Sequence, residues 1–130
     1  MILNILFISL KSIIAPMTKR VSLFQISEDM RIGLTKAAAI STIQGQKKSI
    51  NDCILEALED YVGLDDDQQP MPQVEQLASC KYTVRMTDEL KTKISMTAAK
   101  WQLKTGLPVR MNAVVNKAIA RYLANNPCQN

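Results

Sequence analysis

Lys81, Thr83 and Arg85 are the residues of this 130-residue chain whose types and spacing best suit recognition chemistry. They alternate with apolar residues in the stretch KYTVRM (81–86), so a β-strand there would expose all three polar side chains on one face. Lysine and arginine can donate hydrogen bonds to O6 and N7 of guanine, and threonine can bond a base or touch a thymine methyl group. The pattern favours a face that reads nucleic-acid bases, with an ordinary solvated sheet face as the alternative.

Positive charge is concentrated in the same part of the chain. Residues 80–130 carry nine basic residues against Asp88 and Glu89, although the whole chain has a net charge of only +4. The segment 63–79 is acidic, and its charged residues are Asp65, Asp66, Asp67 and Glu75. A polyanionic partner would therefore bind the second half of the chain.

The composition argues against enzymatic chemistry. The chain has no histidine, which removes the commonest general base and metal ligand. Its cysteines, Cys53, Cys80 and Cys128, are far apart and lack a C-x-x-C spacing. We therefore expect no enzyme activity, no catalytic residue, no metal and no cofactor, and we interpret the cysteines as reduced thiols of a cytoplasmic protein, with Cys53 buried on a helix.

Residues 1–16, MILNILFISLKSIIAP, form an apolar N-terminal extension. The charged start and the cleavage site of a secretory signal are missing, and Lys11 interrupts runs that are too short for a bilayer span. Three interpretations stay open: translation that begins at Met17, an accessory helix, or a targeting segment. None of these interpretations changes the expected function, and we expect no membrane partner.

Period and capping residues predict the elements of residues 17–62. KRVSLFQI (19–26) is expected to be a strand, and Ser27 to cap a helix that ends near Gly45. Asn51 is expected to cap a second helix that runs to about Val62. The acidic, proline-containing segment 63–79 is typical of a solvated linker.

The same order of elements returns after the linker. TVRMTDEL (83–90) matches LFQISEDM (23–30) at an offset of 60 residues, and RMNAVVNKAIARYL (110–123) matches SINDCILEALEDYV at an offset of 61. In this second unit, residues 80–124, Thr87 is the expected N-cap, and Trp101 is in phase with the buried side of the helix that follows. Residues 125–130 form a short tail. The chain is therefore an internal duplication of a strand–helix–helix unit.

One such unit cannot bury a core by itself, because a single strand has two unpaired edges and about 45 residues is a small domain. Two units can pair their strands and pack four helices against them. The predicted fold class is mainly α with a short two-stranded antiparallel ribbon, formed as a pseudo-dimer within one chain. The alternative is two chains that pair like with like.

The unit resembles the ribbon-helix-helix DNA-binding family, the Arc and MetJ class of repressors. The resemblance rests on the alternating strand before a capped helix, the turn glycines Gly45 and Gly106, and a second helix opened by SIN (49–51) or RMN (110–112). It implies that the ribbon enters the major groove of double-stranded DNA. The outward strand positions of the family correspond to Lys81, Thr83, Arg85, Val21, Leu23 and Gln25.

These six positions differ in chemistry between the two units. Gln25 can bridge N6 and N7 of adenine, whereas Val21 and Leu23 depart from the polar pattern of the family. The two aliphatic residues can contact thymine methyl groups or face another protein. We therefore expect an asymmetric site that is read mainly through the second strand.

The resemblance implies a second set of contacts, to phosphates, at the start of each second helix. Backbone N–H groups beside the expected N-caps would hold a phosphate, and neighbouring residues would add charge. The candidate phosphate-binding residues are Lys47, Lys48, Ser49 and Asn51 in the first unit and Lys104, Arg110 and Asn112 in the second.

The function implied is sequence-specific binding of double-stranded DNA, by a transcriptional repressor or by an accessory protein of plasmid conjugation. Implied partners are the DNA, further copies of the chain through self-association on DNA, and proteins of the relaxosome. The alternative function is a protein-interaction module, such as an antitoxin or an assembly adaptor.

Overall fold

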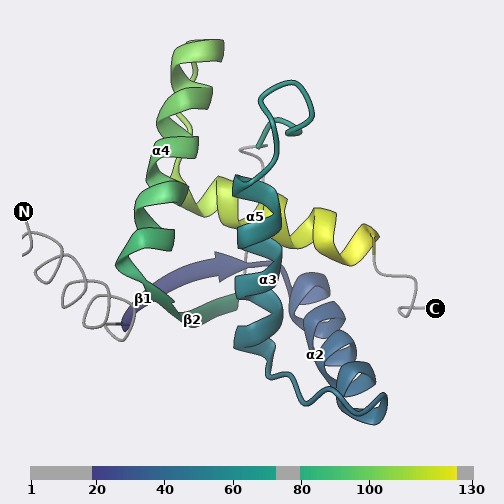
Figure 1. Cartoon of the computed structure of the whole chain (residues 1–130). Coiled ribbons are helices and arrows are strands. Elements are labelled where there is room, and N and C mark those ends of the chain that lie inside the picture. The colour runs from purple at the N-terminus through teal and green to yellow at the C-terminus, as the bar shows by residue number, and fades with distance from the viewer. Residues whose placement is uncertain (1–18, 73–79, 126–130) are drawn as a thin grey trace, which may run out of the picture.

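The computed structural model describes residues 19–72 and 80–125. Within them lie two strands and four helices, which confirms the predicted fold class at this level (Figure 1). The predictions for residues 1–16, for the second half of the linker and for most of the C-terminal tail fall outside the described residues. The elements are β1 (Lys19–Ile26), α2 (Glu28–Ile43), α3 (Ile50–Val62), β2 (Cys80–Thr87), α4 (Asp88–Thr105) and α5 (Met111–Ala124).

The strands β1 and β2 pair with each other as an antiparallel ribbon. The predicted alternation is confirmed, since Phe24, Ile26, Val84 and Met86 are buried on one face of this ribbon. The opposite face is exposed. Its cross-strand pairs are Val21 with Arg85, Leu23 with Thr83, and Gln25 with Lys81.

Serine and threonine cap the two helices that follow the strands, as predicted. The Ser27 hydroxyl accepts a hydrogen bond from the Met30 backbone N–H at 3.2 Å, and the Thr87 hydroxyl accepts one from Leu90 at the same distance. Each cap satisfies one of the backbone donors that the first turn of a helix leaves unpaired.

The predicted N-caps of α3 and α5 were wrong. Ser49 caps α3 and forms a reciprocal capping box with Asp52, which satisfies two backbone donors where an asparagine cap would satisfy one. Arg110 occupies the cap position of α5 without a side-chain hydrogen bond. Asn51 and Asn112 therefore lie inside the first turns, and their side chains are available for contacts with the ribbon.

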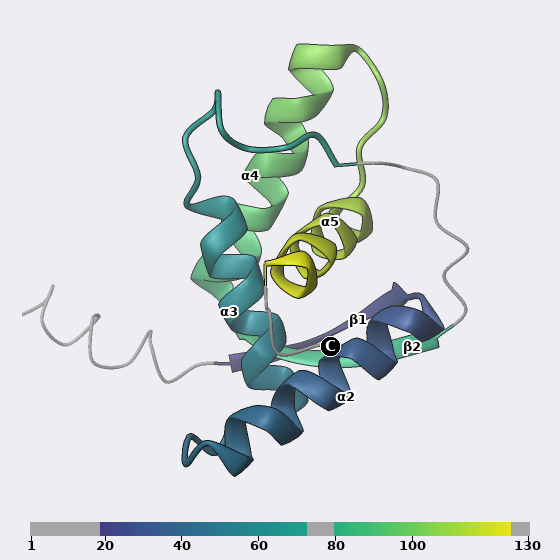
Figure 2. The same cartoon turned by 90° about the vertical axis from the view of Figure 1, so that its right-hand side faces the viewer.

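The core lies between the inner face of the ribbon and the four helices. Helices α3 and α5 pack against each other, while α2 and α4 leave the ribbon in opposite directions, α4 upward and α2 downward in Figure 1 (see also Figure 2). Cys53 and Trp101 are both buried in the core, as predicted. Ile43 is 84% exposed because it is the last residue of α2.

The first part of the linker packs against both halves of the chain, which its composition did not predict. Gln69 is buried, and its amide group donates to the Tyr61 carbonyl at 2.8 Å and accepts from the Trp101 indole N–H at 2.7 Å. The Tyr61 hydroxyl donates to the Pro70 carbonyl. Asp66, which is exposed as expected of an acidic linker, pairs with Lys100 at 2.7 Å. The linker thus joins the end of α3 to α4.

Gln69→Ala is expected to lower the free energy of unfolding by about 1–3 kcal/mol. The substitution leaves the buried indole N–H of Trp101 and the Tyr61 carbonyl without their partner, and an unsatisfied buried group costs about that much. Urea denaturation followed by circular dichroism measures it. Gln68→Ala is the matched control, because Gln68 is the neighbouring residue and its side chain is exposed. This control is expected to change the free energy of unfolding little. Equal stability of the two variants would contradict the bridging role of Gln69.

Candidate nucleic-acid interface

The exposed face of the ribbon carries six side chains in three cross-strand pairs. Lys81 and Arg85 both lie on β2, about 13 Å apart along a strand that rises about 3.3 Å per residue. Antiparallel pairing places Gln25 beside Lys81 and Val21 beside Arg85. Each end of the ribbon therefore presents one cation of β2 beside one residue of β1.

Two aliphatic side chains of β1 lie on this face. Leu23 is 60% exposed and lies opposite Thr83, and Val21, two residues away on the same strand, is 59% exposed. A partner with an apolar group could bury these two neighbouring aliphatic side chains, which would be favourable because it removes them from water.

Asn51 holds the end of the ribbon that carries Arg85. Its side-chain Oδ1 accepts from the Arg85 backbone N–H at 2.8 Å, and its Nδ2 donates to the Arg85 carbonyl at 3.1 Å. The Asn51 amide group thus pairs with both the backbone N–H and the carbonyl that Arg85 directs away from the ribbon. The contact fixes the backbone from which the Arg85 side chain projects.

Asn112 makes the same pair of contacts at the other end. Its Oδ1 accepts from the Gln25 backbone N–H at 2.8 Å, and its Nδ2 donates to the Gln25 carbonyl at 3.1 Å. Buried Asn116 adds a third bond, from its Nδ2 to the same carbonyl at 2.8 Å. This role of Asn51 and Asn112 was not predicted from the sequence, although their matching positions in the two units indicated that both make equivalent contacts.

These asparagine contacts bring the N-termini of α3 and α5 to the two ends of the ribbon. A helix N-terminus carries partial positive charge and unpaired backbone N–H groups. The capping box of α3 uses the Ser49 hydroxyl, whereas α5 has no side-chain acceptor at its cap. Both helix starts thus lie beside the exposed face that carries Lys81 and Arg85.

The basic candidates near the helix starts have different surroundings. Lys48 is bound to Glu56, with 2.6 Å between Nζ and Oε2, and this hydrogen bond raises the pKa of the lysine. Lys104, in the last turn of α4, lies 4.8 Å from the centre of the Trp101 ring. Lys47 and Arg110 are exposed. Lys47 and Arg110 are therefore the candidates best placed to meet an external anion.

The two described cysteines lie away from the exposed face of the ribbon, Cys53 in the core and Cys80 in phase with the inward residues of β2. Burial raises the pKa of the Cys53 thiol, which keeps it in the unreactive protonated form. Cys80, at the end of β2, donates from its Sγ to a carboxylate oxygen of Glu28 at 2.8 Å. Hydrogen bonds from Arg31 and then from Cys80 lower the pKa of that carboxyl to about 2.

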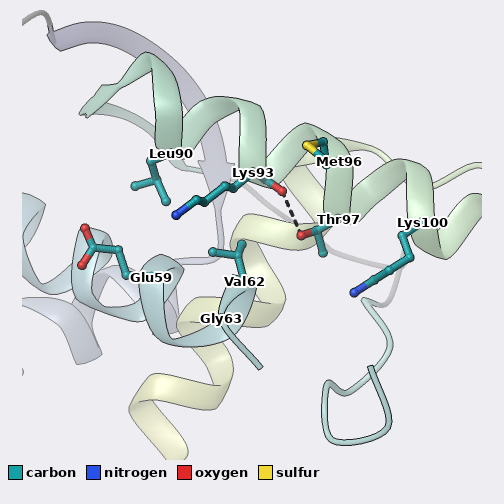
Figure 3. Close-up of a pocket in the computed structure, with 8 residues that line it drawn as sticks. All are labelled: Glu59, Val62, Gly63, Leu90, Lys93, Met96, Thr97 and Lys100. Carbon is teal, nitrogen blue, oxygen red and sulfur yellow. Dashed lines mark hydrogen bonds between the residues drawn. The ribbon is translucent and has the colours of Figure 1, made fainter. Parts of the chain in front are cut away.

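A hollow of about 420 Å³ lies between α3 and α4, built from residues outside the ribbon (Figure 3). Lys93 of α4 extends across it, and the Lys93 carbonyl accepts from the Thr97 hydroxyl at 2.8 Å. Gly33 is the residue of α2 that matches Lys93 in the duplicated sequence. A Cβ on this glycine would lie 2.9 Å from Cδ1 of Leu123, so α2 and α5 pack closely where α3 and α4 stay apart.

Comparison with models of known protein families, with curated proteins and with solved structures finds no match to this chain. Across residues 19–72 and 80–125, none of the helices combines the length and apolar character that crossing a membrane requires. The features that indicate a function are therefore the residues of the ribbon face and the helix starts beside it.

Proposed function

We propose that this chain binds double-stranded DNA sequence-specifically, with its β-ribbon in the major groove. The observation that carries the proposal is the exposed ribbon face, on which Lys81, Thr83 and Arg85 project between two helix N-termini. A two-stranded ribbon fits the major groove, whose base edges carry a distinct pattern of donors and acceptors for each base pair. Binding involves no covalent chemistry.

In this proposal the base contacts and the phosphate contacts come from different elements. Lys81 and Arg85 donate to guanine, Gln25 bridges adenine, and Thr83 contacts the base between them. The starts of α3 and α5 receive phosphates through their backbone N–H groups, with Lys47 and Arg110 adding charge. The phosphate contacts set the position of the ribbon, and the side chains of the ribbon read the sequence.

The chain forms a tandem ribbon-helix-helix pseudo-dimer in this proposal. Two observations support pairing within one chain: β1 pairs with β2, and the asparagine contacts cross between the units. Asn51 of the first unit holds Arg85 of the second, and Asn112 of the second holds Gln25 of the first. Each unit thereby completes the strand of the other.

The biological role proposed is occupancy or bending of a site on DNA, as a transcriptional repressor or as an accessory protein at a plasmid transfer origin. Further copies of the chain on adjacent sites, or proteins of the relaxosome, are the partners that this role implies. The chain would act in the cytoplasm.

Selection of random duplexes followed by a salt titration tests the proposal. We expect enrichment of one family of sequences. The logarithm of the association constant should fall linearly with the logarithm of the salt concentration, at a slope of about −4 if about four phosphates are contacted. Mutated duplexes at the same salt concentration provide the control for specificity. Binding that neither depends on salt nor enriches any sequence would contradict the proposal.

The exposure of Val21 and Leu23 favours one second candidate, a protein-interaction module in which a partner covers the aliphatic part of the ribbon. Purification of the chain with a bound protein, together with no retention of duplex DNA, would favour this candidate over the first.

A further inference from the structure

The aliphatic patch formed by Val21 and Leu23 has a defined place within the reading face. Antiparallel pairing puts Leu23 opposite Thr83 at the centre and puts Val21 opposite Arg85 at one end. Both aliphatic side chains are more than half exposed. The patch is therefore bounded by the guanidinium of Arg85 at one end and by the polar pair of Gln25 and Lys81 at the other.

Among the base edges of the major groove, only one group matches an aliphatic side chain. Thymine presents a C5-methyl group, whereas guanine, adenine and cytosine present hydrogen-bond donors and acceptors alone. A cytosine amino group against Leu23 would lose its water without gaining an acceptor, which is unfavourable. A methyl group there would instead be buried against carbon.

We propose that Val21 and Leu23 make this chain a reader of pyrimidine 5-methyl groups, an inference that rests on the proposed DNA-binding function. Leu23 contacts the methyl group of a central thymine, and Val21 contacts a second one next to the guanine bound by Arg85. Two residues of strand span about 6.6 Å and one base step about 3.4 Å, so the two methyl groups lie about two base steps apart. A 5-methylcytosine carries the same methyl group and would be bound in the same way.

Charge favours DNA over a protein as the group that covers this patch. Lys81 and Arg85 lie on the same face, and the helix starts of α3 and α5 lie at its ends. A partner that covers the aliphatic patch therefore also meets two cations and two sites suited to anions. A polyanion with methyl groups on its accessible edge satisfies all of these together.

Chemically modified duplexes test methyl reading without altering the protein. The duplex selected by the wild-type chain is synthesised with single thymines replaced by deoxyuridine, which removes only the methyl group. Two positions about two base steps apart are expected to respond. A single replacement at either position should lower the affinity of the chain for the duplex about fourfold, the factor that burial of one methyl group provides. A duplex with cytosine at the central position is expected to bind more tightly when that cytosine is methylated at C5.

Variants assign each methyl group to a side chain. Leu23→Ala is expected to bind the thymine and deoxyuridine duplexes equally at the central position, and Val21→Ala at the position beside the guanine. Ile43→Ala is the matched control, because Ile43 is an aliphatic residue that is 84% exposed at the end of α2 and outside the ribbon. This control is expected to keep the full difference between the two duplexes, and circular dichroism checks that all three variants fold.

Two results separate failure of this inference from failure of the proposed function. If every deoxyuridine duplex binds as tightly as its thymine counterpart while binding still depends on Arg85, methyl reading is wrong and DNA binding stands. If the chain selects no duplex at all, the proposed function fails and the inference fails with it. An undiminished difference in the Leu23→Ala and Val21→Ala variants would also overturn the assignment to these residues.

Discussion

Arg85→Ala is expected to weaken binding to the selected duplex by about ten- to a hundredfold. A bidentate contact between arginine and guanine contributes about 1–3 kcal/mol of discrimination, and alanine removes both donors. The Arg85 side chain is exposed on the ribbon, so the fold should tolerate the change. The variant should also lose its preference for the base pair at that end, while its preferences at the Lys81 end persist.

Fluorescence anisotropy with labelled duplexes at one fixed salt concentration measures this effect. Lys36→Ala provides a control of equal charge loss, because Lys36 is exposed on α2 and outside the ribbon. We expect the control to change affinity by a small factor and to leave base preference intact. Unchanged binding of Arg85→Ala to the selected duplex would exclude readout by this strand.

Asn51→Ala is expected to impair specific binding more than Asn112→Ala does. The first substitution removes both bonds that Asn51 makes to the backbone of Arg85. The second leaves the Gln25 carbonyl with its bond from Asn116, so the strand there keeps one anchor. Each net hydrogen bond contributes about 0.5–1.5 kcal/mol, so we expect the loss of two bonds in Asn51→Ala to lower the free energy of unfolding by about 1–3 kcal/mol.

The measurement compares the two variants in urea denaturation and in binding to the selected and to an unrelated duplex. A positioning role predicts that Asn51→Ala loses several-fold more affinity for the selected duplex than for the unrelated one. Arg85 would then project from a less fixed backbone, while the phosphate contacts that both duplexes share remain. An equal loss of affinity for the two duplexes would contradict the positioning role and would show that Asn51 only stabilises the fold.

Local patterns were sufficient for the elements and for much of the core. The alternation in both strands, the caps Ser27 and Thr87, and the buried phase of Trp101 all follow from neighbours within a turn or two of the chain. The N-cap of α3 was predicted wrongly because Ser49 and Asn51 both suit the start of this helix, and the reciprocal bonds between Ser49 and Asp52 favour the serine. The N-cap of α5 was predicted wrongly because this helix begins at Met111, after Arg110, without a side-chain cap.

The linker shows a second limit of local patterns. Its acidic and proline-containing composition indicated a solvated spacer, yet Gln69 is buried between Tyr61 and Trp101. A glutamine amide can donate to a carbonyl and accept from an indole N–H at the same time. This pair of bonds cannot be predicted from the sequence, because it requires a fold that brings the two groups together. The partner on α4 lies 32 residues away in sequence.

The sequence by itself determined which side chains the ribbon exposes, because a strand turns alternate residues to opposite faces whatever it pairs with. Only the tertiary structure decided their neighbours. The register sets Arg85 beside Val21 and Lys81 beside Gln25, so each end of the ribbon receives one cation although both come from β2. The asparagine contacts that hold these ends join residues 34 and 87 positions apart, beyond the reach of any local period.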